Sequence, residues 1–178
     1  KVDDNIGSGY QYLYSHGALG VQNSLNILLG EASVGTTSDR NLLITRLHDN
    51  DDSTAAGSLE LDISQLVGDG QWHTYALTVA SGAGSRMYID GVQQATDTLG
   101  GDSFNPTTDI YFGAREDLDS VRFYGGSLDS VQISNRALSA EEVSDVHTGG
   151  SSLATVTVGV GPLASANVAG RKARGPNK

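Results

Sequence analysis

Hydrophobic and polar residues alternate in several short segments of this chain, and the segments are separated by Gly, Asp, Asn and Ser. Alternation with a period of two is typical of strands that have one face in a core and the other in solvent. The pattern predicts strands at about residues 10–16, 25–29, 42–47, 58–63, 74–79, 85–89, 92–95, 110–112 and 128–133. Many short strands joined by turns indicate an all-β sandwich.

One segment near the end of the pattern predicts a helix, at residues 139–146. Ser139 is a favourable N-cap, and Glu142 stands three residues later, which is the spacing of a capping box. Asp90 and Gly91 lie between two strand patterns and predict a tight hairpin turn. Parallel α/β folds need long helices between strands, and the sequence pattern does not provide them.

Aromatic residues give two further expectations. Tyr10, Tyr12 and Tyr14 would share one strand face by the period of two, either as a partly covered face of a sheet or as a stacking platform. Trp72 stands at the start of the strand pattern of residues 74–79, so we expect its side chain to be buried in the core.

Composition limits the choice of function. The chain has 178 residues and no Cys, so it cannot form disulfides. Its length suits one domain, predicted at residues 1–149, followed by a C-terminal extension at residues 150–178. The extension has an alternating apolar stretch that could form an extra strand, and it ends in a basic segment. The net charge of −10 argues against a nucleic-acid partner, since phosphate backbones require Lys and Arg. The sequence also lacks an apolar run of the roughly 20 residues that a membrane span needs.

Three segments carry a family resemblance: Asp-Gly-Gln-Trp-His-Thr-Tyr-Ala-Leu at residues 69–77, Arg-Met-Tyr-Ile-Asp-Gly at residues 86–91, and residues 126–139 with Gly-Ser-Leu-Asp-Ser-Val followed by Asn-Arg-Ala-Leu-Ser. Their order and spacing resemble the laminin-G-like branch of the concanavalin A-like jelly rolls, which includes the pentraxins. The resemblance covers about residues 10–147. It implies a jelly-roll β-sandwich with one short C-terminal helix, and a non-catalytic recognition or adhesion module, extracellular or at the cell surface, that binds a glycan or an extracellular protein.

The start of the chain departs from this family. Its members usually open with an extra strand or two, whereas only nine residues precede Tyr10 here. Residues 1–6, residues 156–160 or a strand from another chain would then cover the open position. The last possibility is strand exchange, and it leads to an alternative function as a structural subunit of an extracellular filament or surface assembly.

Two acidic loops are candidates for Ca²⁺, which prefers six to eight oxygen ligands from carboxylates, amides and carbonyls. The pentraxin resemblance implies a calcium loop after the strand at residues 110–112, with an Asn from an earlier segment. The second loop is a run of closely spaced Asp residues, and a solvated acidic turn is the alternative for both. The predicted metal ligands are Asn23, Glu116, Asp117 and Asp119 for the first loop, and Asp49 and Asp51 for the second.

One segment resembles a catalytic motif. Glu60, Asp62 and Ser64 match the Glu-x-Asp-x-Glu core of glucanases with this fold, except that Ser stands at the last position. Retaining and inverting glycosidases both need a second carboxyl group that a Ser cannot supply. We therefore expect no enzyme activity, and a glycoside hydrolase relic is the alternative with the least support.

Overall fold

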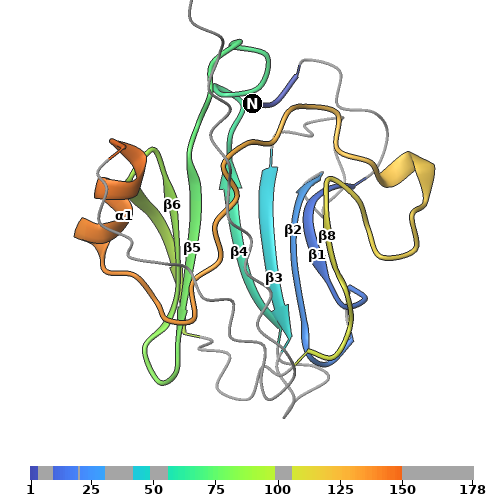
Figure 1. Ribbon diagram of the computed structural model, residues 1–178, viewed down its shortest axis with the longest axis horizontal. Coiled ribbons are helices and arrows are strands. Elements are labelled where there is room, and N and C mark those ends of the chain that lie inside the picture. Colours follow the sequence, from blue (N-terminus) through green and yellow to red (C-terminus); the bar gives the residue numbers. More distant parts are fainter. Residues whose placement is uncertain (4–9, 20, 31–41, 49–55, 99–105, 150–178) are drawn as a thin grey trace, which may run out of the picture.

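The computed structural model describes residues 1–3, 10–19, 21–30, 42–48, 56–98 and 106–149. Two antiparallel sheets form a sandwich, which confirms the predicted fold class (Figure 1). The five-stranded sheet has the order β4-β3-β2-β1-β8, and its strands are β1 (Gln11–His16), β2 (Ser24–Gly30), β3 (Leu42–His48), β4 (Ala56–Asp62) and β8 (Ile110–Phe112). The three-stranded sheet has the order β5-β6-β7, with β5 (Tyr75–Ala80), β6 (Gly84–Ile89) and β7 (Val92–Asp97).

The main core lies between the two sheets. Alternate residues of β2 and β3 point into it, and β6 supplies Met87 from the other sheet. Burial of this apolar face contributes most of the stability of such a sandwich. The buried members are Ile27, Leu29, Leu43, Leu59, Ile63 and Met87.

The opposite side of the five-stranded sheet, here called the outer face, has its own small cluster of Tyr12, Leu28 and Ile44. A β-bulge between Tyr12 and Tyr14 shifts the register of β1 against β2. Because of the bulge, Tyr12 lies on the outer face, whereas Tyr14 packs against the main core. The expectation that these two tyrosines share a face was therefore wrong.

After β8 the chain leaves the sheet and returns to it at Phe123. Gly113 has a φ of 72° at the exit, and residues 113–122 then form a loop that contains the 3₁₀ helix η1 (Ser120–Arg122). Phe123 comes back beside Tyr12 in a parallel bridge. This loop lies beside the β1–β8 end of the five-stranded sheet (Figure 1), and its Glu116 accepts a hydrogen bond from Ser15 of β1.

The predicted helix is α1 (Ala140–His147), and both hydrogen bonds of the predicted capping box are formed. Val143 is its buried residue. The helix lies close to the β6–β7 hairpin, where a Cβ on Gly91 would stand 3.1 Å from Cα of Ser144. Among the described residues, no helix is long and apolar enough to cross a membrane.

The first residues of the chain lie between two later segments. Val2 bridges Val67 on one side and Gly126 on the other, and its carbonyl accepts a hydrogen bond from the Gly68 amide at 3.1 Å. Which of the three coverings considered above is used stays a prediction. Residues 4–6 and 156–160 lie outside the described residues, as does the C-terminal extension.

Two local expectations were wrong. Residues 128–133 do not form a ladder strand, and Ser130 interrupts the extended backbone with a φ of 54°. Trp72 is 58% exposed instead of buried. The ladder of β5 starts at Tyr75, and His73 turns toward two aspartates, so the loop before β5 leaves the indole ring in solvent.

Candidate functional site

The structure places the predicted calcium ligands Glu116, Asp117 and Asp119 in the loop of residues 113–122. Two arginines engage them: Arg115 lies 2.6 Å from Asp117 and 3.7 Å from Glu116, and Arg122 lies 3.9 Å from Asp119. Asp117 and Asp119 also accept hydrogen bonds from backbone amides of the loop, at 3.1 and 3.2 Å. Much of the negative charge of this loop is therefore compensated within the protein itself.

Asn23, the remaining predicted ligand of this loop, lies between β1 and β2 with a φ of 57°. Across the described residues, no group of three or more His, Asp and Glu side chains gathers where a metal ion would fit. Asp49 and Asp51 lie outside the described residues. Calcium binding by either loop stays a prediction.

The strand register creates a polar row that crosses the outer face from one edge of the sheet to the other. The row follows the Cα pairs of four neighbouring strand pairings and has one residue on each strand. Its members are Ser58 on β4, Arg46 on β3, Asn26 on β2, Ser15 on β1 and Tyr111 on β8. Ser15 and Asn26 are fully buried, and the flanking members are partly exposed.

A carboxylate stands beside each half of this polar row. Glu60 on β4 accepts a hydrogen bond from Ser58 Oγ at 3.3 Å and lies 3.6 Å from the Arg46 guanidinium. Glu116 in the loop accepts a hydrogen bond from Ser15 Oγ at 3.2 Å. The row therefore presents hydroxyl, amide, guanidinium and carboxylate groups together.

Several buried polar atoms in this region have no hydrogen-bond partner among the residues that the structure describes. They are Asn26 Oδ1, Tyr12 OH, Arg115 Nε and Arg122 Nε. The amide nitrogen of Asn26 does donate to the carbonyl of Gly17 at 3.3 Å, so only one end of that side chain is satisfied. Unpaired buried polar groups are rare in folded proteins because each one loses its hydration without compensation.

Tyr12 illustrates the polarity of this region. Burial raises the pKa of its hydroxyl, and the positive charges of Arg115 and Arg122 partly oppose that shift. Arg115 is close enough to influence this pKa, but the two groups do not have the geometry of a hydrogen bond. Arg122 also lies over the Tyr10 ring, 5.9 Å from its centroid, in a cation–π arrangement.

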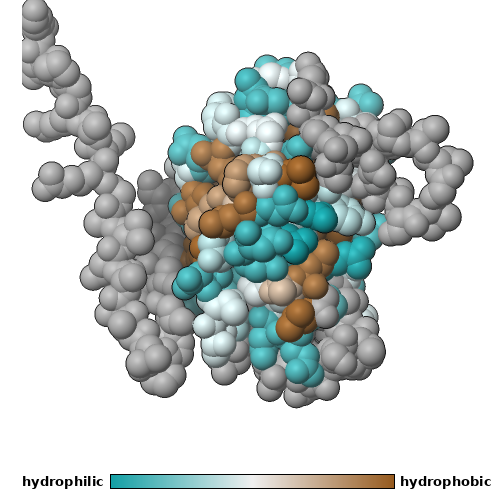
Figure 2. All heavy atoms as spheres, turned by 90° about the vertical axis from the view of Figure 1, so that its right-hand side faces the viewer, coloured by the Kyte–Doolittle hydropathy of each residue, from teal (hydrophilic) through white to brown (hydrophobic). Residues whose placement is uncertain are grey.

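The edge beside this site carries exposed apolar side chains. Figure 2 views the molecule from the side of β8 and the loop, and shows hydrophobic residues standing among hydrophilic ones. Exposed members from this part of the chain are Phe112, Leu118, Val121 and Phe123. The polar site thus borders a surface of mixed character.

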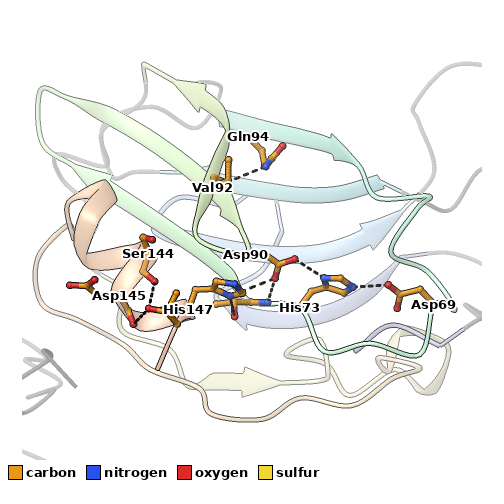
Figure 3. Close-up of polar contacts among 10 residues, drawn as sticks. Asp69, His73, Asp90, Val92, Gln94, Ser144, Asp145 and His147 are labelled. Carbon is orange, nitrogen blue, oxygen red and sulfur yellow. Dashed lines mark hydrogen bonds and ion pairs between the residues drawn. The ribbon is translucent and has the colours of Figure 1, made fainter. Parts of the chain in front are cut away.

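A second polar cluster, here called the His73 cluster, joins the start of β5 to the β6–β7 hairpin and to α1 (Figure 3). The His73 ring lies between two carboxylates, with Nε2 at 2.8 Å from Asp69 and Nδ1 at 2.8 Å from Asp90. Asp90 also accepts a hydrogen bond from the Thr74 amide at 2.8 Å, and the His147 ring lies 3.0 Å from Thr74 Oγ1. Figure 3 shows these side chains pointing toward one another.

The charges of the His73 cluster stabilise one another. Hydrogen bonds to Asp90 and Asp69 raise the pKa of His73. The Gln71 amide and His73 lower the pKa of Asp69, and His73 and the Thr74 amide outweigh burial to lower the pKa of Asp90. Both ring nitrogens have partners, so the protonated ring is favoured and the cluster acts as a structural clamp.

Sequence reasoning missed the polar row because the row exists only through the pairing of distant strands. One signal was present: Asn26 stands inside an otherwise apolar strand pattern at residues 25–29. A polar residue at a buried strand position needs a partner, and a missing partner suggests a ligand or an ordered water.

Comparison with known proteins places the fold. A family model described as the concanavalin A-like lectin/glucanases superfamily matches residues 15–144. The native heptameric SAP-like pentraxin from Limulus polyphemus is similar over 80% of this chain and 64% of its own, with 18% identity and a TM-score of 0.56. This chain therefore spans less than two thirds of the pentraxin chain, and the likeness shows the fold. An S-layer domain-containing protein from Clostridium thermocellum shares 18% identity over 79% of this chain and 64% of its own, with a TM-score of 0.37. No curated protein matches the sequence.

Proposed function

Because this chain belongs to the concanavalin A-like lectin/glucanases superfamily, we propose that it is a non-catalytic recognition and adhesion module. It acts outside the cell or at the cell surface, and it binds a glycan or an extracellular protein. The fold is shared by proteins with different functions, so the proposal depends on a site as well as on the family.

The observation that carries the proposal is the unused hydrogen-bonding capacity of the outer face. Asn26 Oδ1 and Tyr12 OH are buried without partners, and Arg46, Glu60 and Arg115 stand around them in partly exposed positions. Such convergent polar groups are typical of a site that fixes the orientation of a ligand.

Geometry supports a binding role over hydrolysis. Glu60 and Glu116 stand beside β4 and β1, three strand spacings apart, or roughly 14 Å. Catalytic carboxyl pairs of glycosidases are at most about 9.5 Å apart. The Ser64 amide lowers the pKa of the neighbouring Asp62, whereas a general acid needs a raised pKa.

Calcium dependence is part of the proposal. The predicted ligands are Asn23, Glu116, Asp117 and Asp119 in one loop and Asp49 and Asp51 in the other. An ion in the first loop would organise the polar groups beside the five-stranded sheet. For the first loop it would have to displace Arg115 or Arg122 from the carboxylates, which predicts weak affinity.

The proposal is tested by binding assays with the whole chain. Immobilised protein is screened against a glycan array and against extracellular matrix proteins, with Ca²⁺ and with a chelator, and glucan hydrolysis is followed in parallel. We expect saturable binding and no release of reducing ends. Binding to none of these surfaces, or hydrolysis that Glu60→Gln abolishes, would contradict a non-catalytic recognition role.

A second candidate is a structural subunit completed by strand exchange. Among the described residues, β5 and β7 are the edge strands of the three-stranded sheet, and the apolar side chains of Leu128 and Val131 are exposed elsewhere on the domain. An open edge of this kind can accept a strand from another chain. Light scattering after size exclusion separates the candidates: a mass near 18.5 kDa indicates a monomer, and an open-ended assembly indicates a subunit.

A further inference from the structure

We propose that His73 is a proton-operated latch, which holds the loop of residues 68–72 against the β6–β7 hairpin when its ring is charged and releases the loop when the ring is neutral. The inference goes beyond the proposed recognition function and does not rest on it. It is carried by the position of one imidazole ring between two carboxylates that come from separate parts of the chain (Figure 3). The loop includes Trp72, which is the only Trp in the sequence.

The ring of His73 has a carboxylate at each of its two nitrogens. Nδ1 lies 2.8 Å from Asp90 Oδ2, and Nε2 lies 2.8 Å from Asp69 Oδ2. An ionised carboxylate can only accept hydrogen bonds, so both contacts need an N–H on the ring. The charged ring has an N–H on both nitrogens, whereas the neutral ring has one. In the neutral state, one carboxylate therefore faces a nitrogen lone pair at hydrogen-bond distance, and that contact becomes repulsive.

Asp90 is the better anchored of the two aspartates. Its Oδ1 accepts a hydrogen bond from the Thr74 amide at 2.8 Å, and its own amide donates to the Thr74 carbonyl at 2.9 Å. The other hydrogen bond of Asp69 comes from the Gln71 amide at 2.8 Å, inside the same loop, so it does not attach the loop to another element. We therefore expect the neutral ring to keep its proton on Nδ1 for Asp90 and to lose its contact with Asp69.

The loop has few other attachments. All of its residues are exposed, and Gly68 and Gly70 have φ values of 71° and 76°, so glycine stands at two points where the backbone can change conformation easily. The Gly68 amide donates to the Val2 carbonyl at 3.1 Å, but among the described residues no backbone–backbone hydrogen bond involves residues 69–73. Loss of the contact made by the His73 ring therefore frees the loop beyond Gly68 to move while the sheets stay folded.

The pH at which the latch opens is set by the groups that face His73. They are Asp69 in its own loop, Asp90 in the β6–β7 turn and, beyond Asp90 at 3.8 Å, His147 on α1; the positively charged Lys1 also lies near Asp69. Hydrogen bonds to Asp90 and Asp69 raise the pKa of His73 above its usual 6.5, so the latch opens above pH 6.5. The pKa values of the two aspartates are lowered from their usual 3.8, so both stay charged down to a lower pH and the latch stays closed in mild acid.

The test follows the ring and the loop together in the whole chain between about pH 5 and pH 9, a range that brackets the ordinary titration of His. The carbon-bound ring protons of His73 report its titration by NMR. The decay of fluorescence anisotropy reports the mobility of Trp72 without interference from another Trp. We expect the amplitude of the fast decay to rise with the same midpoint as the His73 titration, above pH 6.5. The circular dichroism spectrum should stay constant, because the change is confined to the loop.

Three variants sharpen the test. In Asp69→Asn, the new amide can accept from the charged ring or donate to Nε2 of the neutral ring, so the loop should be held at every pH and the rise in Trp72 mobility should disappear. His73→Asn removes the latch, and Trp72 should be mobile throughout the range. The matched control is His147→Asn, which makes the same change at the neighbouring histidine and should leave the transition in place.

Three results would overturn the latch. The first is a mobility of Trp72 that stays constant while His73 titrates in the wild type, which needs no variant to fold. The second is a transition that persists in Asp69→Asn. The third is a transition that disappears in His147→Asn and persists in His73→Asn, which would make His147 the titrating group. Each of these results leaves the recognition function as it was, because none of the experiments measures binding.

Discussion

The His73 cluster and the outer-face polar row are both rich in charged and polar groups, yet they differ in how completely those groups are satisfied. In the His73 cluster, both ring nitrogens and the Asp90 carboxylate have partners at 2.8 Å. On the outer face, Asn26 Oδ1 and Tyr12 OH are buried with none. A polar network in which every group has a hydrogen-bond partner stabilises the fold, whereas buried groups without partners remain able to bond a ligand. Polarity alone therefore does not mark a functional site. Substitutions in the two regions can test whether the His73 cluster stabilises the fold and the outer face binds a ligand.

The largest expected effect comes from breaking the closed network with Asp90→Ala. The change removes the acceptor for both His73 and the Thr74 amide, and it places Ala at a φ of 49° that suits Asp or Gly better. We expect the free energy of unfolding in urea to fall by about 2–3 kcal/mol. Asp145→Ala, on the exposed side of α1, is the control and should change it by less than about 0.5 kcal/mol. Equal effects of the two changes would show that the cluster is not a clamp.

The pH dependence of stability is the next test. The pKa of His73 is raised in the folded state, so its contribution is full below the unfolded value of 6.5 and is lost as the pH rises through the folded pKa. The pKa values of Asp69 and Asp90 are lowered, so their contributions are present above 3.8 and are lost as the pH falls through the folded values. The difference in urea midpoint between wild type and His73→Asn should therefore shrink between about pH 6 and pH 9. A difference that grows with pH would contradict the geometry of the cluster.

A smaller difference in unfolding free energy is expected between two Tyr→Phe variants. The Tyr75 hydroxyl is bonded to Thr45 Oγ1 at 2.6 Å, so Tyr75→Phe should cost about 1 kcal/mol of unfolding free energy. Tyr12 is fully buried whereas Tyr75 is partly buried, and the Tyr12 hydroxyl has no hydrogen-bond partner among the described residues, so Tyr12→Phe should be neutral or slightly stabilising. Thermal and urea unfolding of both variants measure the contrast. Equal costs would mean that the Tyr12 hydroxyl has a partner in solution.

The local pattern of the sequence predicted much of the fold. Alternation located β1 to β8, and the spacing of Ser139 and Glu142 located α1 with its capping box. What it missed depends on partners far along the chain. The bulge after Tyr12 is decided by pairing with β2, and the exposure of Trp72 follows from the contacts of His73 with Asp69 in its own loop and with Asp90 in the β6–β7 turn.

The candidate site was less accessible to sequence reasoning than the fold. The pentraxin resemblance and the acidic character of the loop indicate Glu116, Asp117 and Asp119 as calcium ligands, but neither reveals that Arg115 and Arg122 engage them. The polar row needs the register of four strand pairings, because its members are spread from Ser15 to Tyr111. Such transverse arrangements have no signature in local periodicity.

The most direct test of the central claim is a map of amide chemical-shift changes on titration with the glycan or protein fragment that binds best in the screen described above. The account predicts shifts concentrated at Ser15, Asn26 and Arg46 and at the neighbouring loop, with the His73 cluster unchanged. Shifts concentrated at His73 and Asp90, with the outer face unchanged, would contradict it.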